Sequence, residues 1–521
     1  MIKIKPFWKT YASLAPLLLL CTYYVFKSFS FEIHDFANYY FGSYFLKEGD
    51  FSHLIYFPHY FNAKIAGLGF DGIFVSYAPN TPFLPLLLIP FSFLPIVTSK
   101  IVFNILSVLL FLFSFKRLSD YLKIKSIYVI ILPFLFFIPI KNNILFGQLY
   151  LILFFLLSEG YLAYKNGKFK STSIFWSLAI FVKVFPLVLF IFLFIEKKYK
   201  ALVYLALACI TLLIVSLSIG TYSMWEFYIT SVLTKANNGE FTFAFVDNYQ
   251  SLFMFLKRLL VFDQIENPHP LLNSTFLFKC LIIFIKIFVL GIAIYLTKYS
   301  KKTFLNFSLW ILASILISPY NSSYITILLM PLYLALIQLE ISNRIKAIFI
   351  VLFFCIANIS YLKLELFPLN YLKLFSLSIL TAIIIFIHKK CIRFKPIIAS
   401  GISVTLFALI WKKSPSKYKP FLNYKTPILM YDYKVSKNNL TYTFWNENGE
   451  NTSQVDLHEN KIDSLNLSIK NNQIYYKNKQ HTFDESNKLK PMRLGDNIIF
   501  FSDQNRGIGF YQLYQIKVQD E

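Results

Sequence analysis

Long apolar runs separated by short polar segments fill most of this chain. Apolar runs of 16 or more residues recur almost to residue 411, and a helix needs about 20 such residues to cross a bilayer. The candidate membrane spans lie at about 11–29, 99–115, 126–140, 144–162, 172–195, 199–219, 273–297, 303–318, 323–340, 345–361, 371–388 and 396–411. The pattern predicts an all-α polytopic membrane protein with about 11–13 membrane segments.

The composition supports this fold class. Of the 521 residues, 56% are hydrophobic and 15% are charged, whereas soluble domains carry about 25% charged residues. The formal net charge is +24. Such an excess of Lys and Arg occurs in nucleic-acid-binding proteins, and also in membrane proteins with basic cytoplasmic loops.

The placement of the basic residues decides between these two classes. If residues 1–9 are cytoplasmic, the segments on that side hold 22 Lys and Arg, and the longer segments on the other side hold 9. This is the positive-inside bias of membrane proteins, so the net positive charge reflects the orientation of the chain in the membrane. We therefore expect no nucleic-acid partner. Cytoplasmic and extracytoplasmic segments alternate along the chain only if 172–195 does not cross the membrane, because basic loops flank it on both sides. Lys183 and Pro186 lie at its centre, and since Pro breaks a helix, we predict a re-entrant pair of half-helices there.

Two long loops, about 30–82 and 220–272, are predicted on the extracytoplasmic side. Residues 83–97 contain three prolines, which favours a helix along the membrane interface over a crossing. The composition turns polar after residue 411, with 16 basic and 12 acidic residues in 412–521. Runs typical of β-strands lie at 428–433, 440–445, 472–476, 497–502 and 510–516. We therefore expect two domains, a transmembrane domain at 1–411 and a small extracytoplasmic β-rich domain at 412–521.

Familiar catalytic motifs are missing from the sequence. It contains no phosphate-binding loop, His-Glu-x-x-His site or Gly-x-Ser-x-Gly elbow. His53 and His59 lack a third ligand and the five Cys are not at metal spacing, so we expect neither a metal nor a cofactor.

Polar residues in apolar surroundings gather instead at the outer ends of the spans. They are His34 and Asp35, Asn142 to Gln148, Lys183, Asn248 to Arg258, and Ser318 to Tyr324. Ionisable groups within a membrane are costly and usually functional. Because these residues all lie on the outer side of the membrane, we predict a pocket at the outer membrane surface.

Six short motifs in this set run in a fixed order. They are the segment from His34 to Asp50, Tyr77-Ala-Pro-Asn-Thr-Pro82, Phe146-Gly-Gln148, Lys183-Val-Phe-Pro186, Asp247-Asn-Tyr-Gln-Ser-Leu252 with Arg258, and Ser318-Pro-Tyr320. The order resembles glycosyltransferase family 87, polyprenyl-phosphate-sugar-dependent enzymes of the GT-C superfamily, over about 30–340. Family members often carry a His shortly after the Ser-Pro pair, whereas this chain reads Asn321-Ser-Ser-Tyr324.

The resemblance implies an integral-membrane hexosyl- or pentosyltransferase that moves a sugar from a polyprenyl-phosphate donor to a lipid or glycan acceptor. In the family an Asp in the first outer loop is the catalytic base, and Asp35 stands at that position. Such a base takes the proton of the acceptor hydroxyl, while fixed cations stabilise the departing lipid phosphate. The candidates for the phosphate contacts are Lys183 and Arg258. The candidates for sugar or acceptor contacts are His34, Tyr39, Tyr40, Tyr77, Gln148, Asn248 and Gln250.

Simpler interpretations of these residues stay open. Asp35 could cap an interfacial helix, and Lys183 could snorkel from a span that does cross. Gln148 and Asn248 could be helix caps, and Arg258 an interfacial anchor.

Two rival functions also remain. A lipid or oligosaccharide transporter or flippase predicts inverted repeats, and a ligase or polymerase would use diphosphate-linked donors. The Lys- and Asn-rich composition indicates an AT-rich bacterial genome. We therefore expect a multi-pass protein of the bacterial inner membrane that acts in cell-envelope glycan biosynthesis, with a cytoplasmic N-terminus and an extracytoplasmic C-terminal domain.

Overall fold

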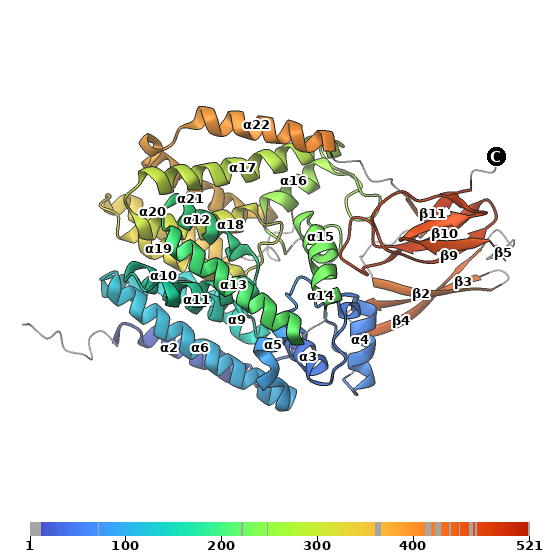
Figure 1. The fold of residues 1–521 in the computed structure, drawn as a ribbon, viewed down its shortest axis with the longest axis horizontal. Helices are drawn as coiled ribbons and strands as arrows, with labels where there is room; N and C mark the ends of the chain where they lie inside the picture. The colour runs from blue at the N-terminus through green and yellow to red at the C-terminus, as the bar shows by residue number, and fades with distance from the viewer. Residues whose placement is uncertain are drawn as a thin grey trace, which may run out of the picture.

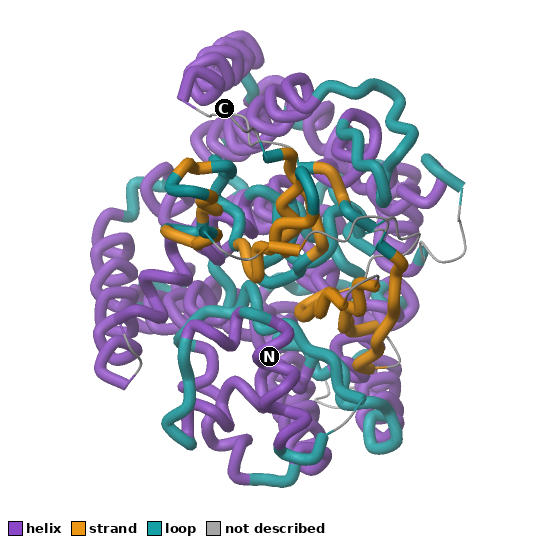
Figure 2. The backbone as a smooth tube through the Cα atoms, turned by 90° about the vertical axis from the view of Figure 1, so that its right-hand side faces the viewer, coloured by secondary structure: helices purple, strands orange, loops and turns teal. Residues whose placement is uncertain are grey.

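Helices make up the chain as far as residue 411, and strands follow (Figure 1). The computed structural model describes residues 12–70, 72–219, 222–246, 248–359, 366–411, 418–422, 429–436, 439–446, 449–457, 462–463 and 466–518. Figure 2 shows that the strands lie over one end of the helical part. The predicted fold class, a helical membrane protein with a small β-rich C-terminal region, is confirmed.

The apolar helices coincide with the candidate spans. They are α2 (Ala15–Lys27), α6 (Ile96–Tyr121), α7 (Ser126–Ile130), α8 (Leu132–Leu135), α9 (Phe137–Phe146), α10 (Tyr150–Lys165), α11 (Phe169–Val182), η3 (Phe185–Leu187), α12 (Val188–Ile195), α13 (Tyr199–Ile219), α17 (Thr275–Tyr299), α18 (Thr303–Ile317), η5 (Tyr324–Leu329), α19 (Met330–Ile337), α20 (Asn343–Asn358), η7 (Leu369–Tyr371), α21 (Leu372–Ile387) and α22 (Phe394–Trp411). The short basic turn η8 (Lys389–Cys391) lies between α21 and α22. Within the described ranges, four helical stretches are long and apolar enough to cross a membrane, or five if the bent pair α9 and α10 forms one span. Seven further apolar helices have 10–17 residues, so the predicted number of crossings, about 11–13, stays a prediction.

Prolines and one glycine explain where the apolar runs are divided. Pro133, Pro186 and Pro331 each lie in the first turn of α8, η3 and α19, where the missing N–H costs nothing. The gap at 141–143 between the candidate spans 126–140 and 144–162 is not a loop, because these residues belong to α9. The chain turns later, at Gly147, and α9 and α10 meet there with a bend of 115°.

The two long loops are themselves folded. The first contains α3 (Phe36–Lys47), η1 (His53–Tyr56) and α4 (Pro58–Gly67), and α5 (Leu84–Leu88) and η2 (Ile89–Phe93) follow it. The second contains α14 (Tyr222–Phe227), the π-helical turn η4 (Tyr228–Val232), α15 (Leu233–Asn237) and α16 (Leu252–Leu260). Helices α4, α14 and α15 lie between the membrane helices and the strands (Figure 1). Both loops therefore reach the side of the molecule that carries the C-terminal region.

The C-terminal region forms three antiparallel sheets. Their strands are β1 (Lys419–Pro420), β2 (Leu429–Ser436), β3 (Asn439–Asn446), β4 (Gly449–Asp456), β5 (Ile462–Asp463), β6 (Leu467–Lys470), β7 (Gln473–Tyr476), β8 (Lys479–Gln480), β9 (Lys488–Leu494), β10 (Asn497–Ser502) and β11 (Gln512–Lys517). The strand orders are β1-β11-β10-β9-β5, β2-β3-β4 and β6-β7-β8. All five predicted β-runs coincide with strands of the described residues.

Strand β10 is the centre of this region because both of its faces are apolar. Successive side chains of a strand point to opposite faces. Ile499 and Phe501 pack with Met430 and Leu513 in one cluster, while Ile498 and Phe500 pack with other side chains in a second. The five-stranded sheet is therefore covered on both sides, as expected of a small folded unit.

Candidate functional site

The candidate base, Asp35, lies at the junction between α2 and α3. Helix α3 begins at Phe36 with Asp35 in the N-cap position, yet the Asp35 side chain makes no capping hydrogen bond. The preceding residue, His34, has a φ of 53°, which directs the chain sharply into α3. About a third of the Asp35 side chain is exposed (32%). The carboxylate is thus held away from the helix end and remains open to a reactant.

A chain of side-chain hydrogen bonds orients this carboxylate. The Gln148 Nε2 group donates to Asp35 Oδ2, and the Tyr39 hydroxyl donates to Gln148 Oε1 over 2.9 Å. Burial raises the pKa of Tyr39 well above its ordinary value of 10.0, with Asp35 adding to the effect. Tyr39 therefore keeps its proton and fixes the Gln148 amide with its N–H toward Asp35.

Gly147 brings Gln148 to this position for two reasons. It ends α9 with a φ of 67°, in the left-handed region that favours glycine. A Cβ atom at Gly147 would also lie 2.7 Å from the Phe36 Cβ, so only glycine lets the turn approach α3 this closely. The His34 ring stacks on the neighbouring Phe146 with ring centres 3.9 Å apart, and its Nδ1 lies 3.4 Å from Asp35 Oδ1.

Lys183 lies at a genuine break between apolar helices. Helix α11 ends at Val182, and Lys183 has extended backbone angles before η3 begins. Its ammonium donates to Asn80 Oδ1 over 3.0 Å and lies 5.9 Å from the centre of the Tyr150 ring. The structure therefore joins the motif at 77–82 to the motif at 183–186. Whether the broken segment is re-entrant stays a prediction.

Electrostatic interactions connect these parts around Asp35. Both Lys183 and the buried Lys100 interact with its carboxylate. So do Tyr150, Tyr249 and Tyr324. Two cations and three phenol groups, from five separate segments of the chain, therefore interact with Asp35.

The second outer loop and the Ser-Pro-Tyr segment form the neighbouring wall. Asn321 donates from Nδ2 to the Gln250 carbonyl over 3.1 Å, and the Ser251 hydroxyl donates to the Pro319 carbonyl over 2.6 Å. Buried Lys373 donates to the carbonyls of Asn321 and Ser322. Gln250 is buried, while Asn248 is half-buried. Asp247, which opens this motif, lies outside the described residues.

Three predicted contact residues have other surroundings. The Tyr40 hydroxyl donates to the Leu94 carbonyl, so its ring faces η2. Tyr77 is fully buried between Phe51, Tyr56 and Phe61. The Arg258 guanidinium lies 5.6 Å from the centre of the Phe245 ring in the second outer loop. Their roles toward sugar or phosphate stay predictions.

Sequence reasoning missed Lys100, Lys373 and Asn80. The first two are single lysines inside apolar runs, and this was the signal that could have found them. Lys100 donates to the Glu32 carbonyl, close to Asp35 in the sequence. Asn80 belongs to a motif that was recognised, but its contact with Lys183 spans 103 residues.

Across the described ranges, no group of three or more His, Cys, Asp and Glu could hold a metal ion. His53 packs on Phe227 and His59 on Tyr431. What the site presents is a partly exposed carboxylate of fixed orientation that interacts electrostatically with two lysines. Such an arrangement can take a proton from a hydroxyl and attract an anion.

Comparison with known proteins finds a family match over part of the chain, which begins after Asp35. The family model for glycosyltransferase family 87 matches residues 78–319. No curated protein and no solved structure matches the chain. The match covers the motifs around Asn80, Gln148, Lys183 and Gln250, and it ends within the Ser-Pro-Tyr segment.

Proposed function

We propose that this protein is a membrane glycosyltransferase that moves a hexose or pentose from a polyprenyl-phosphate donor to a lipid or glycan acceptor. The match of residues 78–319 to the glycosyltransferase family 87 model supports this proposal. Asp35 is the general base of the reaction, and Lys183 binds the donor phosphate. The reaction takes place on the extracytoplasmic face of a bacterial inner membrane, in the assembly of cell-envelope glycans.

One observation supports the assignment of the base above all others. Asp35 leaves the end of α3 without a capping bond and accepts from Gln148 instead. A carboxylate that only capped the helix would accept from a backbone N–H of the first turn. The simpler interpretation of Asp35 is therefore the weaker one.

The chemistry balances with these residues. As the acceptor oxygen forms its bond to the anomeric carbon, Asp35 takes the hydroxyl proton. The bond between that carbon and the phosphate oxygen breaks, and its electron pair leaves with the lipid phosphate. Lys183 stabilises the growing negative charge. His34, Gln148, Asn248 and Gln250 remain the candidates for contacts with sugar or acceptor.

The arrangement of the loops supports the proposed sidedness. Asp35 and Gln250 belong to the two long loops, and α4, α14 and α15 of these loops adjoin the β-rich region (Figure 1). The charge bias of the sequence assigns all three parts to the extracytoplasmic side.

The test is sugar transfer by purified protein in lipid nanodiscs, with monophosphate- and diphosphate-linked donors compared. We expect transfer from the monophosphate donor, and we expect Asp35→Asn to lower turnover by about 10²–10⁴-fold while donor binding survives. Glu32→Gln and Asp50→Asn are the matched controls, because Glu32 is exposed and Asp50 pairs with Lys64 at the surface.

Three outcomes would contradict the proposal. Near-normal turnover of Asp35→Asn rejects this residue as the base, and an inactive Glu32→Gln beside it moves the role to Glu32. Transfer from diphosphate donors alone would identify a ligase or polymerase.

A further inference from the structure

The loop from Asp503 to Phe510, which joins β10 to β11, makes the main contacts between the β-rich region and the second outer loop. The Lys235 ammonium, from α15, lies 2.9 Å from Asp503 Oδ1. The same ammonium donates to the carbonyls of Asp503 and Arg506 over 3.1 and 3.0 Å. One lysine of the second outer loop is therefore held at three points by the turn at 503–506.

A buried ion pair adds a second connection. Arg506 Nη2 lies 2.6 Å from Glu266 Oε1, and each side chain is only 3% exposed. The other oxygen, Glu266 Oε2, accepts from the backbone N–H of Phe245 over 2.9 Å. Since removing one partner of a buried pair leaves the other charge uncompensated, the contact depends on both regions being in place.

Backbone contact completes the interface. The Gly507 N–H donates to the Thr242 carbonyl over 2.7 Å. A Cβ at Gly507 would lie 2.0 Å from the Phe241 carbonyl oxygen, so the loop can approach this closely only with glycine there. The ring of Phe510 packs on Phe243 with centres 5.3 Å apart.

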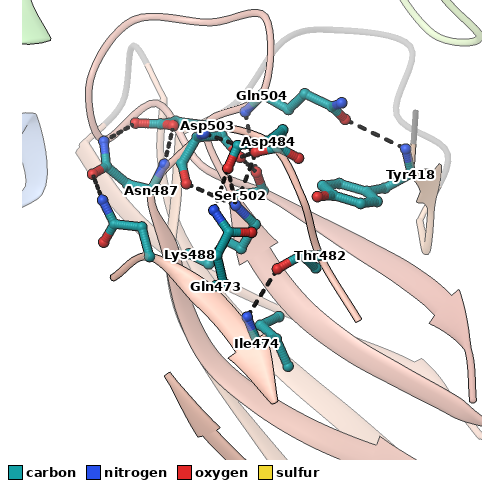
Figure 3. A network of polar contacts seen from close by, with 12 residues as sticks. Tyr418, Gln473, Ile474, Thr482, Asp484, Asn487, Lys488, Ser502, Asp503 and Gln504 are labelled. Atoms are coloured by element: carbon teal, nitrogen blue, oxygen red, sulfur yellow. Dashed lines mark hydrogen bonds and ion pairs between the residues drawn. The ribbon is translucent and has the colours of Figure 1, made fainter. Parts of the chain in front are cut away.

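A network inside the β-rich region gives the 503–510 loop its shape (Figure 3). The completely buried Asp503 carboxylate accepts from the backbone N–H and the side-chain amide of Asn487. It also accepts from the N–H of Gly509. Ser502 interacts with Ser486, which donates to Asp484. The loop therefore presents its contacts already ordered by its own sheet.

The segment that this loop holds leads directly to the candidate site. Phe241 packs on Tyr320 with ring centres 4.9 Å apart, and Tyr249 packs on Tyr320 at 5.2 Å. Tyr249 interacts electrostatically with Asp35, and Ser251 donates to Pro319. Contacts are therefore continuous from the β-rich region to the wall of the site.

We propose that the 503–510 loop clamps segment 241–251 over the candidate site, and that Asp503 and Arg506 are positioning residues for glycosyl transfer. They act through Lys235 and Glu266 and touch no reactant. The inference rests on the proposed function for its catalytic consequence, but its mechanical part, the clamping of 241–251, does not. The β-rich region would then contribute to catalysis by positioning one wall of the site.

The test uses the full chain in nanodiscs and the variant Gly507→Ala. Hydrogen exchange in peptides that cover 241–251 should become at least about tenfold faster, because the added methyl group meets the Phe241 backbone. The kcat should fall by about 10–100-fold with a smaller change in donor KM, since misplacement of a wall by about 1 Å weakens catalysis by up to about 10². Gly67→Ala is the matched control, because Gly67 is exposed in the first outer loop and a Cβ there meets nothing within 4 Å.

A second set of variants tests the same proposal in case Gly507→Ala does not fold. Arg506→Met should loosen 241–251 and lower kcat, and the double variant Arg506→Met/Glu266→Gln should recover both, because it leaves no uncompensated charge. Unchanged exchange in 241–251 would overturn the clamp. Faster exchange with unchanged kcat would overturn the positioning role. A wild-type protein that transfers no sugar would count against the proposed function alone, since exchange would still decide whether the loop is clamped.

Discussion

Lys183 is the residue whose replacement tests the donor site most directly. In the structure its ammonium carries one defined hydrogen bond, to Asn80 Oδ1 at 3.0 Å. An ammonium has three donors, so a phosphate oxygen can be bound while Asn80 keeps the group in position. Lys183→Met retains the length and apolar stem of the side chain and removes only the cation.

The expected magnitude follows from the loss of one charge-assisted hydrogen bond. Such a bond contributes about 1.5–3 kcal/mol, which corresponds to a rise in the donor Kd of about 10–150-fold. Asn80→Leu keeps the cation and removes its anchor, so its Kd should rise less. Lys183→Arg should lie between Lys183→Met and the wild type, because it retains the charge but not the geometry.

The assay is binding of polyprenyl phosphate to purified variants in nanodiscs, with thermal unfolding of each variant as a check of folding. Lys170→Met is the matched control. It removes the same charge from the exposed, opposite end of α11, so its Kd should equal that of the wild type.

Two results would refute the assignment. A folded Lys183→Met protein with wild-type affinity would exclude Lys183 from the donor site. Weaker binding by Arg258→Met, with unchanged binding by Lys183→Met, would move the phosphate to the second outer loop, where Arg258 lies over Phe245.

Three further predictions concern orientation, the tail and pH. Alkaline phosphatase fused after Lys419 should be active, because the charge bias makes the tail extracytoplasmic; an inactive fusion there would overturn the topology. Residues 412–521 expressed alone should give a β-type circular dichroism spectrum with a cooperative melt, since both faces of β10 are covered within the tail; a random-coil spectrum would contradict this. Burial, aided by Lys490, lowers the pKa of His59 below its ordinary 6.5, and His59 stacks on Tyr431 of the tail. Contact between α4 and the β-rich region therefore makes His59 harder to protonate than it is when the two are apart. This contact should weaken as the pH falls below about 6.5 and stay constant above it. His59→Gln should remove this pH dependence of thermal stability, and an unchanged dependence would exclude His59 as its source.

The sequence predicted the elements of this protein well because their signals are local. Apolar runs and prolines located the helices and most of their breaks, and short runs typical of β-strands located β2, β3, β7, β10 and β11. The turn at Gly147 was misplaced by a few residues, since the polar side chains of Lys141 to Asn143 resemble a loop although they continue α9.

The contacts of the site could not be predicted in the same way. The bond from Gln148 to Asp35 joins residues 113 positions apart, and that from Lys183 to Asn80 spans 103. The pairing of Arg506 with Glu266 spans 240 positions, and neither residue stands out among the charges of its own segment. Such pairings depend on how helices pack, about which hydropathy carries no information.

A common feature of the candidate residues explains why they stand out in the sequence although their pairings do not. These residues lie at interruptions of helices. Asp35 follows His34 and Gln148 follows Gly147, and both preceding residues have a positive φ. Lys183 itself has an extended backbone. Non-helical backbone at membrane depth is tolerated only where protein or a water-filled cavity surrounds it. Interruptions that come together therefore bring polar groups close to one another, as the proposed binding of a phosphate and a sugar requires. Each also leaves a visible mark in the sequence, a Gly, a Pro or an isolated charge within an apolar run, whereas the partner that it meets leaves none.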